Sequence, residues 1–163
     1  MVIGLNLCPF AKKPFQLDLI KYRLIDSDDL QIITQQVIDE LRFLERTPIE
    51  QVETTLIILP NTLESFESYW DYIGLVENLV ADMDLEGILQ IASFHPCYQF
   101  AGSDADDPAN YSNRSPYPTI HLLREASLTK ALENYPNPEQ IPEKNIATLR
   151  EMGVTLLRSL MNG

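Results

Sequence analysis

The sequence predicts an α/β fold, and three observations support this prediction. Short apolar runs of strand length alternate with longer segments in which apolar residues recur at helical spacing. Each segment between the first three strands is long enough for a right-handed crossover between parallel strands. A fourth apolar run follows a long polar loop, and helical patterns end the chain. We therefore expect a βαβαβ core with a fourth strand after the loop and C-terminal helices; a ferredoxin-like α+β arrangement is the alternative.

The first half of the chain predicts two strands with a helix between them. Residues 18–25 alternate, with apolar side chains on one face and Lys21 and Arg23 on the other, which indicates a half-exposed strand near a sheet edge. The sequence DSDD then supplies cap residues for a helix whose apolar stripe covers residues 30–44. The continuous apolar run at 53–60 is typical of a strand that is buried on both faces.

The second half predicts two more strands and three helices. An apolar stripe predicts a helix over residues 66–83, and the runs at 87–94 and 119–124 predict the third and fourth strands. A short helix is expected at 127–134, and a last helix begins near Pro142. Gly153 is the weak point of this last helix. Its expected apolar stripe consists of Ile146, Leu149, Leu156 and Leu160.

Length, charge and cysteine content restrict the class of protein. With 163 residues, the chain 1–163 is expected to form a single domain. A net charge of -12 disfavours binding to nucleic acid and to anionic membranes. No apolar run is long enough for a membrane helix, and the N-terminus lacks the pattern of a signal peptide. Two cysteines cannot build a disulfide scaffold, so a cytoplasmic location is expected.

The long loop that follows the third predicted strand is the candidate site. Both histidines of the chain, His95 and His121, stand at its two ends. Ligands of α/β sheets bind outside the carboxyl ends of strands, which is where His95 is expected. A loop as long as residues 96–118 is usually functional or disordered, and its aromatic and proline residues argue against disorder. If the fourth strand returns antiparallel beside the third, Arg114 comes near His95, and we expect the two side chains in one pocket.

The residue types in this loop suggest acid–base chemistry on an anionic substrate. His95 and Asp107 can transfer protons, and Arg114 can hold a carboxylate or phosphate group with two hydrogen bonds. These three are the candidate catalytic residues. The candidate substrate-binding residues are aromatic, hydroxyl or amide side chains of the same loop: Tyr98, Asn110, Asn113, Ser115 and Tyr117. Secondary candidates are Cys8 and His121.

Each candidate also has a structural interpretation, and the sequence leaves these alternatives open. His95 can fix the loop by hydrogen bonds, and Arg114 can pair internally with Asp106 or Asp107. His121 lies between two apolar residues of a strand, and Cys97 can be a small filler. The acidic run DADD lacks the later ligands of an EF-hand, so we assign no metal site and leave any cofactor unknown.

Several strings of the sequence resemble a family of bacterial cytosolic proteins catalogued only as a domain of unknown function. These strings are GLNLCPFA, TTLIILP, SFHP with YQFAG, NRSPYP and HLLRE, and they span most of the chain. The resemblance implies a free-standing bacterial protein and assigns no activity. It marks as signature positions Asn6, Cys8, Pro9, Phe10, His95, Pro96, Asp107, Asn110, Asn113, Arg114, Ser115, Pro116 and His121. It also implies an acidic residue where Cys97 stands here, which argues against Cys97 as a nucleophile.

Three classes of function remain in competition. The first is a small-molecule enzyme, a hydrolase or transferase, which acts on an anionic substrate in the loop at 94–121. The second is a non-catalytic binding module or subunit that uses the aromatic, proline-rich loop. The third is a thiol-dependent redox protein that uses Cys8, although Ala11 replaces the second cysteine of a CPxC motif and apolar neighbours predict low reactivity. A small anionic molecule is the expected partner, and the oligomeric state is left open.

Overall fold

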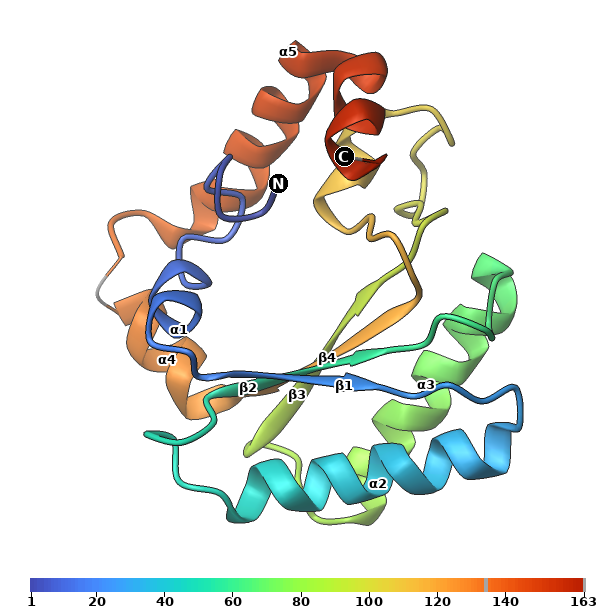
Figure 1. The fold of residues 1–163 in the computed structure, drawn as a ribbon. Coiled ribbons are helices and arrows are strands. Elements are labelled where there is room, and N and C mark those ends of the chain that lie inside the picture. Colours follow the sequence, from blue (N-terminus) through green and yellow to red (C-terminus); the bar gives the residue numbers. More distant parts are fainter. Residues whose placement is uncertain (134, 163) are drawn as a thin grey trace.

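A four-stranded mixed sheet lies at the centre of the computed structural model, which describes residues 1–133 and 135–162 (Figure 1). The strands are β1 (Ile20–Leu24), β2 (Thr54–Ile58), β3 (Leu89–Phe94) and β4 (Thr119–Arg124). β1 pairs with β2 in parallel, whereas β4 lies antiparallel between β2 and β3. The α/β class is confirmed, as is the antiparallel return of the fourth strand beside the third. A ferredoxin-like order would place a hairpin between the second and third strands, where this chain has a helix.

Helices lie on both sides of the sheet (Figure 1). The α-helices of the described residues are α1 (Lys12–Gln16), α2 (Leu30–Arg46), α3 (Phe66–Asp82), α4 (Glu125–Glu133) and α5 (Ile141–Asn162). Two short 3₁₀ helices are η1 (Pro108–Ser112) and η2 (Pro138–Gln140). α2 and α3 cover one face, whereas α1, α4 and the N-terminal segment lie on the other side. The sequence did not predict α1, which is only one turn long. None of the helices in the described part of the chain has the length and hydrophobicity to cross a bilayer.

The main hydrophobic core fills the space between the sheet and the α2–α3 layer. The predicted stripe of α2 is confirmed at Ile33, Val37, Leu41 and Leu44, which are all fully buried. The carboxylate of Asp29 caps this helix by accepting hydrogen bonds from the backbone N–H groups of Gln31 and Ile32. In α3, Tyr69 and Tyr72 are buried, whereas Trp70 is exposed.

The edge strand β1 turns its charged face, rather than its apolar face, toward α2. Lys21 Nζ lies 2.7 Å from Oε2 of Glu40, a buried residue of α2, and Arg23 Nε lies 3.7 Å from Oε1. The alternate side chains Tyr22 and Leu24 are 57% and 59% exposed. The buried carboxylate explains this arrangement, because it needs cationic partners.

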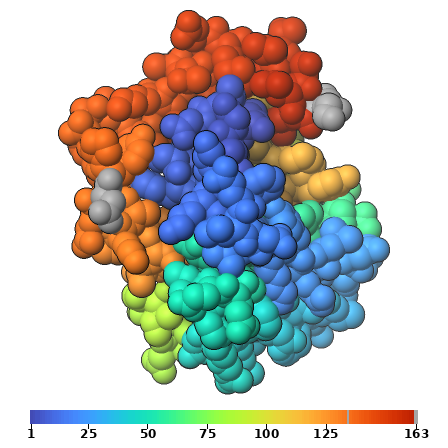
Figure 2. All heavy atoms as spheres, turned by 60° about the vertical axis from the view of Figure 1, so that its left-hand side comes forward, coloured from blue at the N-terminus to red at the C-terminus, as the bar shows by residue number. Residues whose placement is uncertain are grey.

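Gly153 breaks α5 and shifts its apolar stripe by one residue. Its φ of 72° and ψ of 158° are not helical, and a side chain would be strained there. Leu149 is buried as predicted, but after the break Leu157 is buried in place of Leu156. Leu149 and Leu157 pack with Leu7 and Tyr111 in a second cluster. This cluster fastens the N-terminal segment and the loop to α5, and Figure 2 shows the N-terminal segment seated against α5.

Candidate functional site

The loop between β3 and β4 begins and ends at the same edge of the sheet. The backbone N–H of His95 donates to the carbonyl of Asn113 at 3.1 Å, and Asn113 Nδ2 donates to the carbonyl of Ser93 at 3.1 Å. These bonds extend the antiparallel β3–β4 pairing into the loop. The ends of the loop therefore meet as predicted.

His95 is a fully buried residue whose two ring nitrogens are both occupied. Nδ1 accepts the backbone N–H of Cys97 at 3.0 Å, so Nε2 carries the proton and donates to the carbonyl of Leu63 at 3.0 Å. The ring also lies 5.4 Å from that of Phe66 and 5.0 Å from that of Tyr69, between ring centroids. Burial lowers the pKa of His95, which favours the neutral form. The geometry gives His95 a structural role in joining the loop to α3.

Asp107 is held by two sets of hydrogen bonds. Its Oδ1 accepts the backbone N–H of Ala109 at 2.9 Å and thereby caps η1. Arg150 of α5 donates to Oδ1 from Nε at 3.2 Å and to Oδ2 from Nη2 at 2.6 Å. The hydrogen bonds from Arg150 lower the pKa of Asp107 to about 2. Asp107 therefore stays ionised near neutral pH and is poorly suited to act as a general acid.

The amide and aromatic candidates mostly hold the loop together. Asn110 is fully buried; its Oδ1 accepts the backbone N–H of Phe100 at 3.0 Å and the hydroxyl of Ser103 at 2.8 Å. Its Nδ2 donates to the carbonyl of Asp104 at 2.9 Å. Tyr98 is buried in an aromatic cluster with Phe66, Trp70 and Phe100. These contacts fix the shape of the loop, and they leave Tyr98 and Asn110 little surface for a substrate.

Arg114 does not pair with a carboxylate among the described residues. Its Nε donates to the carbonyl of Tyr98 at 3.2 Å, and its Nη2 donates to the carbonyl of Ala105 at 2.7 Å. Its guanidinium carbon lies 4.5 Å from the ring centroid of Tyr111, a buried residue. Of the two interpretations of Arg114 that the sequence left open, the structure does not show the internal pair with Asp106 or Asp107, because Arg158 and Arg150 of α5 contact those carboxylates.

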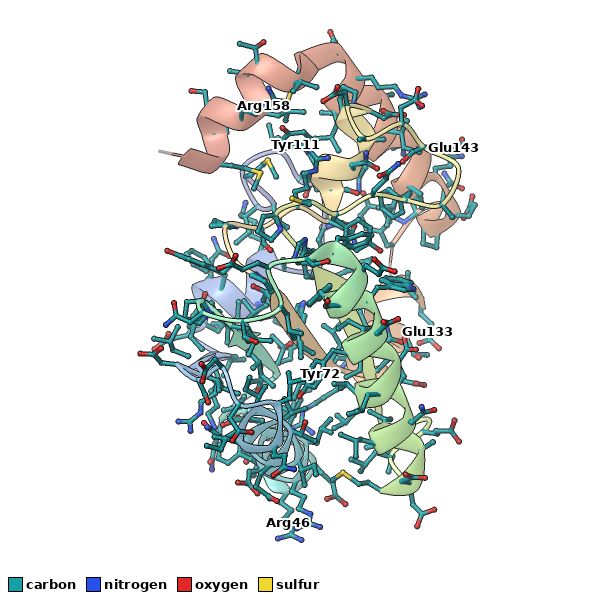
Figure 3. All side chains as sticks on the ribbon, turned by 90° about the vertical axis from the view of Figure 1, so that its right-hand side faces the viewer. Arg46, Tyr72, Tyr111, Glu133, Glu143 and Arg158 are labelled. Carbon is teal, nitrogen blue, oxygen red and sulfur yellow. The ribbon has the colours of Figure 1, made fainter. Side chains whose placement is uncertain are left out.

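A pocket of about 250 Å³, which we call the basic pocket, lies beside Arg114. It is lined by Pro96, Tyr111, Arg114, Ser115, Pro116, Arg158 and Met161. Arg158 comes from the part of α5 beyond Gly153, and Figure 3 shows Tyr111 close to this part of the helix. Arg158 could not be recognised from local sequence patterns, because the bend at Gly153 brings it to the loop. Ser115 donates its hydroxyl to the carbonyl of Tyr117 at 2.5 Å, while the Tyr117 side chain is exposed.

A second pocket, which we call the apolar pocket, has a volume of about 510 Å³. It is lined by Val2, Leu7, Cys8, Phe94, Phe100, Ser112, Asn113, Ile141, Pro142, Asn145 and Ile146. Cys8 is half-buried, unpaired with Cys97, and has no charged residue beside it in this lining. A redox thiol needs a nearby cation or a helix N-terminus, so this setting gives the redox hypothesis no support. Cys97 is exposed on the loop.

The structure places the side chain of His95 at neither pocket, although Arg114 lines one of them. Side chains of a strand point alternately to its two faces, so His95 follows Leu89 and Ile91 toward the main core. Phe94, on the opposite face, lines the apolar pocket instead. Within the described residues, no three acidic, histidine or cysteine side chains converge in a way that could hold a metal ion.

His121 lies on the same face of the sheet as Phe94, and the two ring centroids are 6.1 Å apart. The hydroxyl of Thr54 donates to the carbonyl of Leu122 at 2.6 Å. The same oxygen lies 2.6 Å from Nε2 of His121 and must accept a hydrogen bond from the Nε2–H group. Burial lowers the pKa of His121 to about 4, so the ring is neutral at neutral pH.

Acidification is expected to destabilise the fold through His121. Its pKa is about 4 in the folded chain against 6.5 ordinarily, so between these values the unfolded chain binds more protons. The contribution of neutral His121 to stability is complete above the ordinary pKa and is lost as the pH falls toward the pKa of the folded chain. From pH 7 to pH 5 we expect the free energy of unfolding to fall by about 2 kcal/mol. Urea unfolding at several pH values measures this loss. His95 acts in the same direction, so the comparison with His121→Gln isolates His121; equal pH slopes in the two proteins would contradict the assignment.

A family model described as "Protein of unknown function (DUF1415)" matches residues 1–159. No curated protein and no solved structure matches the chain. The resemblance to a domain of unknown function is therefore confirmed.

Proposed function

This chain belongs to the DUF1415 family of proteins of unknown function, and we propose that it binds a small anionic molecule in the basic pocket. The observation that carries this proposal is the convergence of two arginines, Arg114 and Arg158, on one pocket in a chain of net charge -12. In such a chain most cations are expected to be neutralised by carboxylates. Arg114 instead contacts two neutral carbonyl groups and an aromatic ring.

The contacts of Arg114 orient its guanidinium group but include no carboxylate of the described residues that would neutralise its charge. The bonds to the carbonyls of Tyr98 and Ala105 use Nε and Nη2, so Nη1 has no hydrogen-bond partner among the described residues. Stacking on the buried ring of Tyr111 restricts the remaining rotation. A guanidinium held in this way loses little conformational entropy when it binds a carboxylate or phosphate.

Arg158 supplies a second charge that a ligand can recruit easily. Its Nη2 lies 3.5 Å from Oδ1 of Asp106, and the two side chains are 62% and 85% exposed. Such a long, solvated ion pair contributes little to stability. Arg158 can therefore leave Asp106 and turn toward an anion without a large loss of stability.

The size of the basic pocket limits the ligand. Pockets for drug-sized molecules usually have about 300–1,000 Å³, so a volume of about 250 Å³ suits a single phosphate or carboxylate group on a small molecule. Pro96, Pro116 and Met161 give the pocket partly apolar walls beside the two arginines. A nucleotide or larger ligand would extend into solvent.

Binding, rather than hydrolysis or group transfer, is the activity that these contacts support. The hydroxyl of Ser115 lines the basic pocket but donates to a backbone carbonyl. A serine nucleophile needs an adjacent base, and the lining residues include no histidine or carboxylate. His95 and Asp107, the expected proton-transfer residues, are engaged in structural hydrogen bonds.

Removing Arg158 is expected to weaken anion binding by about tenfold or more, since hydrogen bonds to a charged group contribute about 1.5–3 kcal/mol. Isothermal titration calorimetry of the wild-type protein and of Arg158→Gln, with inorganic phosphate and with succinate, measures the change in dissociation constant. Arg158 is exposed, so this variant should remain folded. Arg114→Lys keeps the charge but loses the planar guanidinium group that can donate two hydrogen bonds to one anion, so this variant should also bind the anions more weakly.

The matched control is Arg46→Gln, which removes the same charge from an exposed position at the end of α2. It should bind phosphate like the wild-type protein. The proposal would be wrong if neither anion bound, or if Arg46→Gln weakened binding as much as Arg158→Gln. The second result would mean that net charge alone governs anion binding.

A further inference from the structure

The apolar pocket is a separate cavity whose lining differs in character from that of the basic pocket. Four parts of the chain form it: the N-terminal segment, the end of β3, the β3–β4 loop and the first turns of α5. We propose that this pocket binds an uncharged, mainly apolar small molecule that carries one hydrogen-bond donor. Binding in the apolar pocket does not depend on anion binding in the basic pocket.

The position and size of the apolar pocket suit a ligand. Phe94 is the last residue of β3, so the pocket lies at the carboxyl end of a strand, where α/β proteins bind their ligands. A volume of about 510 Å³ is within the usual range of about 300–1,000 Å³ for small-molecule sites. Phe100 and Ile146 in its wall remain 38% and 37% exposed. A ligand that covered these two side chains would gain from removing their apolar surface from water.

Among the described residues, the lining of the apolar pocket has no charged side chain, which disfavours an ionised ligand. All of the side chains that line the apolar pocket are uncharged. An ion that entered would lose hydration without gaining a charged partner, which is strongly unfavourable. The net charge of -12 disfavours anions further. The two pockets are therefore expected to take different classes of molecule.

The polar side chains of the apolar pocket leave one hydrogen-bond acceptor for a ligand. Asn145 Nδ2 donates to the carbonyl of Leu7 at 2.7 Å, and Asn113 Nδ2 donates to that of Ser93 at 3.1 Å. The hydroxyl of Ser112 donates to the carbonyl of Ala109 at 3.1 Å. The amide oxygen of Asn145 has no donor among the described residues, which leaves it available to a hydroxyl or N–H group of the ligand. Strongly polar molecules would find too few partners here.

The neutral fluorescent amine N-phenyl-1-naphthylamine is a suitable probe, because it is apolar and carries one N–H group. Its fluorescence should increase saturably on titration with the full chain. Ile146→Glu places a charge in the wall of the pocket and should weaken binding by about tenfold or more. The matched control is Leu156→Glu on the same helix, which is 48% exposed and outside the pocket lining. It should bind the probe like the wild-type protein.

Cys8 reports on the location of the bound probe, because it lines the apolar pocket. In a Cys97→Ser background, saturating probe should slow the labelling of Cys8 by N-ethylmaleimide several-fold. Absence of saturable fluorescence, equal weakening by both glutamate variants, or unchanged Cys8 labelling at saturation would each overturn the proposal. Arg158→Gln should leave probe binding unchanged, so this test fails or succeeds separately from that of anion binding.

Discussion

Replacing His95 with alanine is expected to lower the free energy of unfolding by about 3–5 kcal/mol. Two effects add in this loss. The backbone N–H of Cys97 and the carbonyl of Leu63 would lose their buried partners, which are 3.0 Å from the two ring nitrogens. The space left beside Phe66 and Tyr69 would be a cavity in a closely packed aromatic cluster. Urea unfolding of His95→Ala at neutral pH measures the loss.

Two comparisons separate this structural role of His95 from a role in ligand binding. Gln90→Ala removes an exposed side chain of β3, the strand that ends just before His95, and should change stability by about 0.5 kcal/mol or less. At a temperature where His95→Ala is still folded, its affinity for phosphate should match that of the wild-type protein. If His95→Ala were as stable as the wild-type protein but had lost anion binding, His95 would belong to the binding site.

Replacing Arg124 with leucine is expected to destabilise the chain by about 2–4 kcal/mol. From β4, Arg124 Nη2 donates to the carbonyls of Leu44 at 2.6 Å, Thr47 at 2.5 Å and Val52 at 3.1 Å. These carbonyls lie at the end of α2 and in the connection to β2, where the helix has no further N–H groups to offer. Leucine preserves the apolar stem and removes all three contacts.

The control for Arg124 is Arg42→Leu, at an exposed position on α2. This change should alter the unfolding midpoint in urea only slightly, because surface substitutions usually have small effects. Arg124→Lys should recover part of the lost stability, since an ammonium group can still donate to these carbonyls. Equal midpoints for Arg124→Leu and Arg42→Leu would show that Arg124 does not join α2 to the sheet.

The periodicity of the sequence predicts most of the elements, and the lengths of the connections predict part of the strand pairing. The strand at 119–124 and the buried face of α2 follow from local patterns that the structure confirms. The insertion of β4 between β2 and β3 depends on contacts between distant segments, which no local pattern specifies. Likewise, β1 turns its charged face toward α2 because of the buried carboxylate of Glu40, which lies in another element.

Local patterns predict only part of the candidate site. The prediction that the two ends of the loop meet is confirmed. The alternation of side chains along β3 places His95 on the core face with Leu89 and Ile91, which the sequence could already have indicated. The partners of the acidic loop residues could not be foreseen. Arg150 and Arg158 lie far along the chain in α5, and the break at Gly153 determines where Arg158 reaches the loop.

The most direct test of anion binding in the basic pocket is a titration with inorganic phosphate, followed by the side-chain Nε–Hε NMR signals of the arginines. Binding between the two guanidinium groups predicts that the signals of Arg114 and Arg158 shift together and saturate at one phosphate per chain. The signals of Arg42 and Arg46, on the surface of α2, should remain in place. If the signals of Arg114 and Arg158 did not move, or moved no more than those of Arg42 and Arg46, the chain would not bind an anion in this pocket.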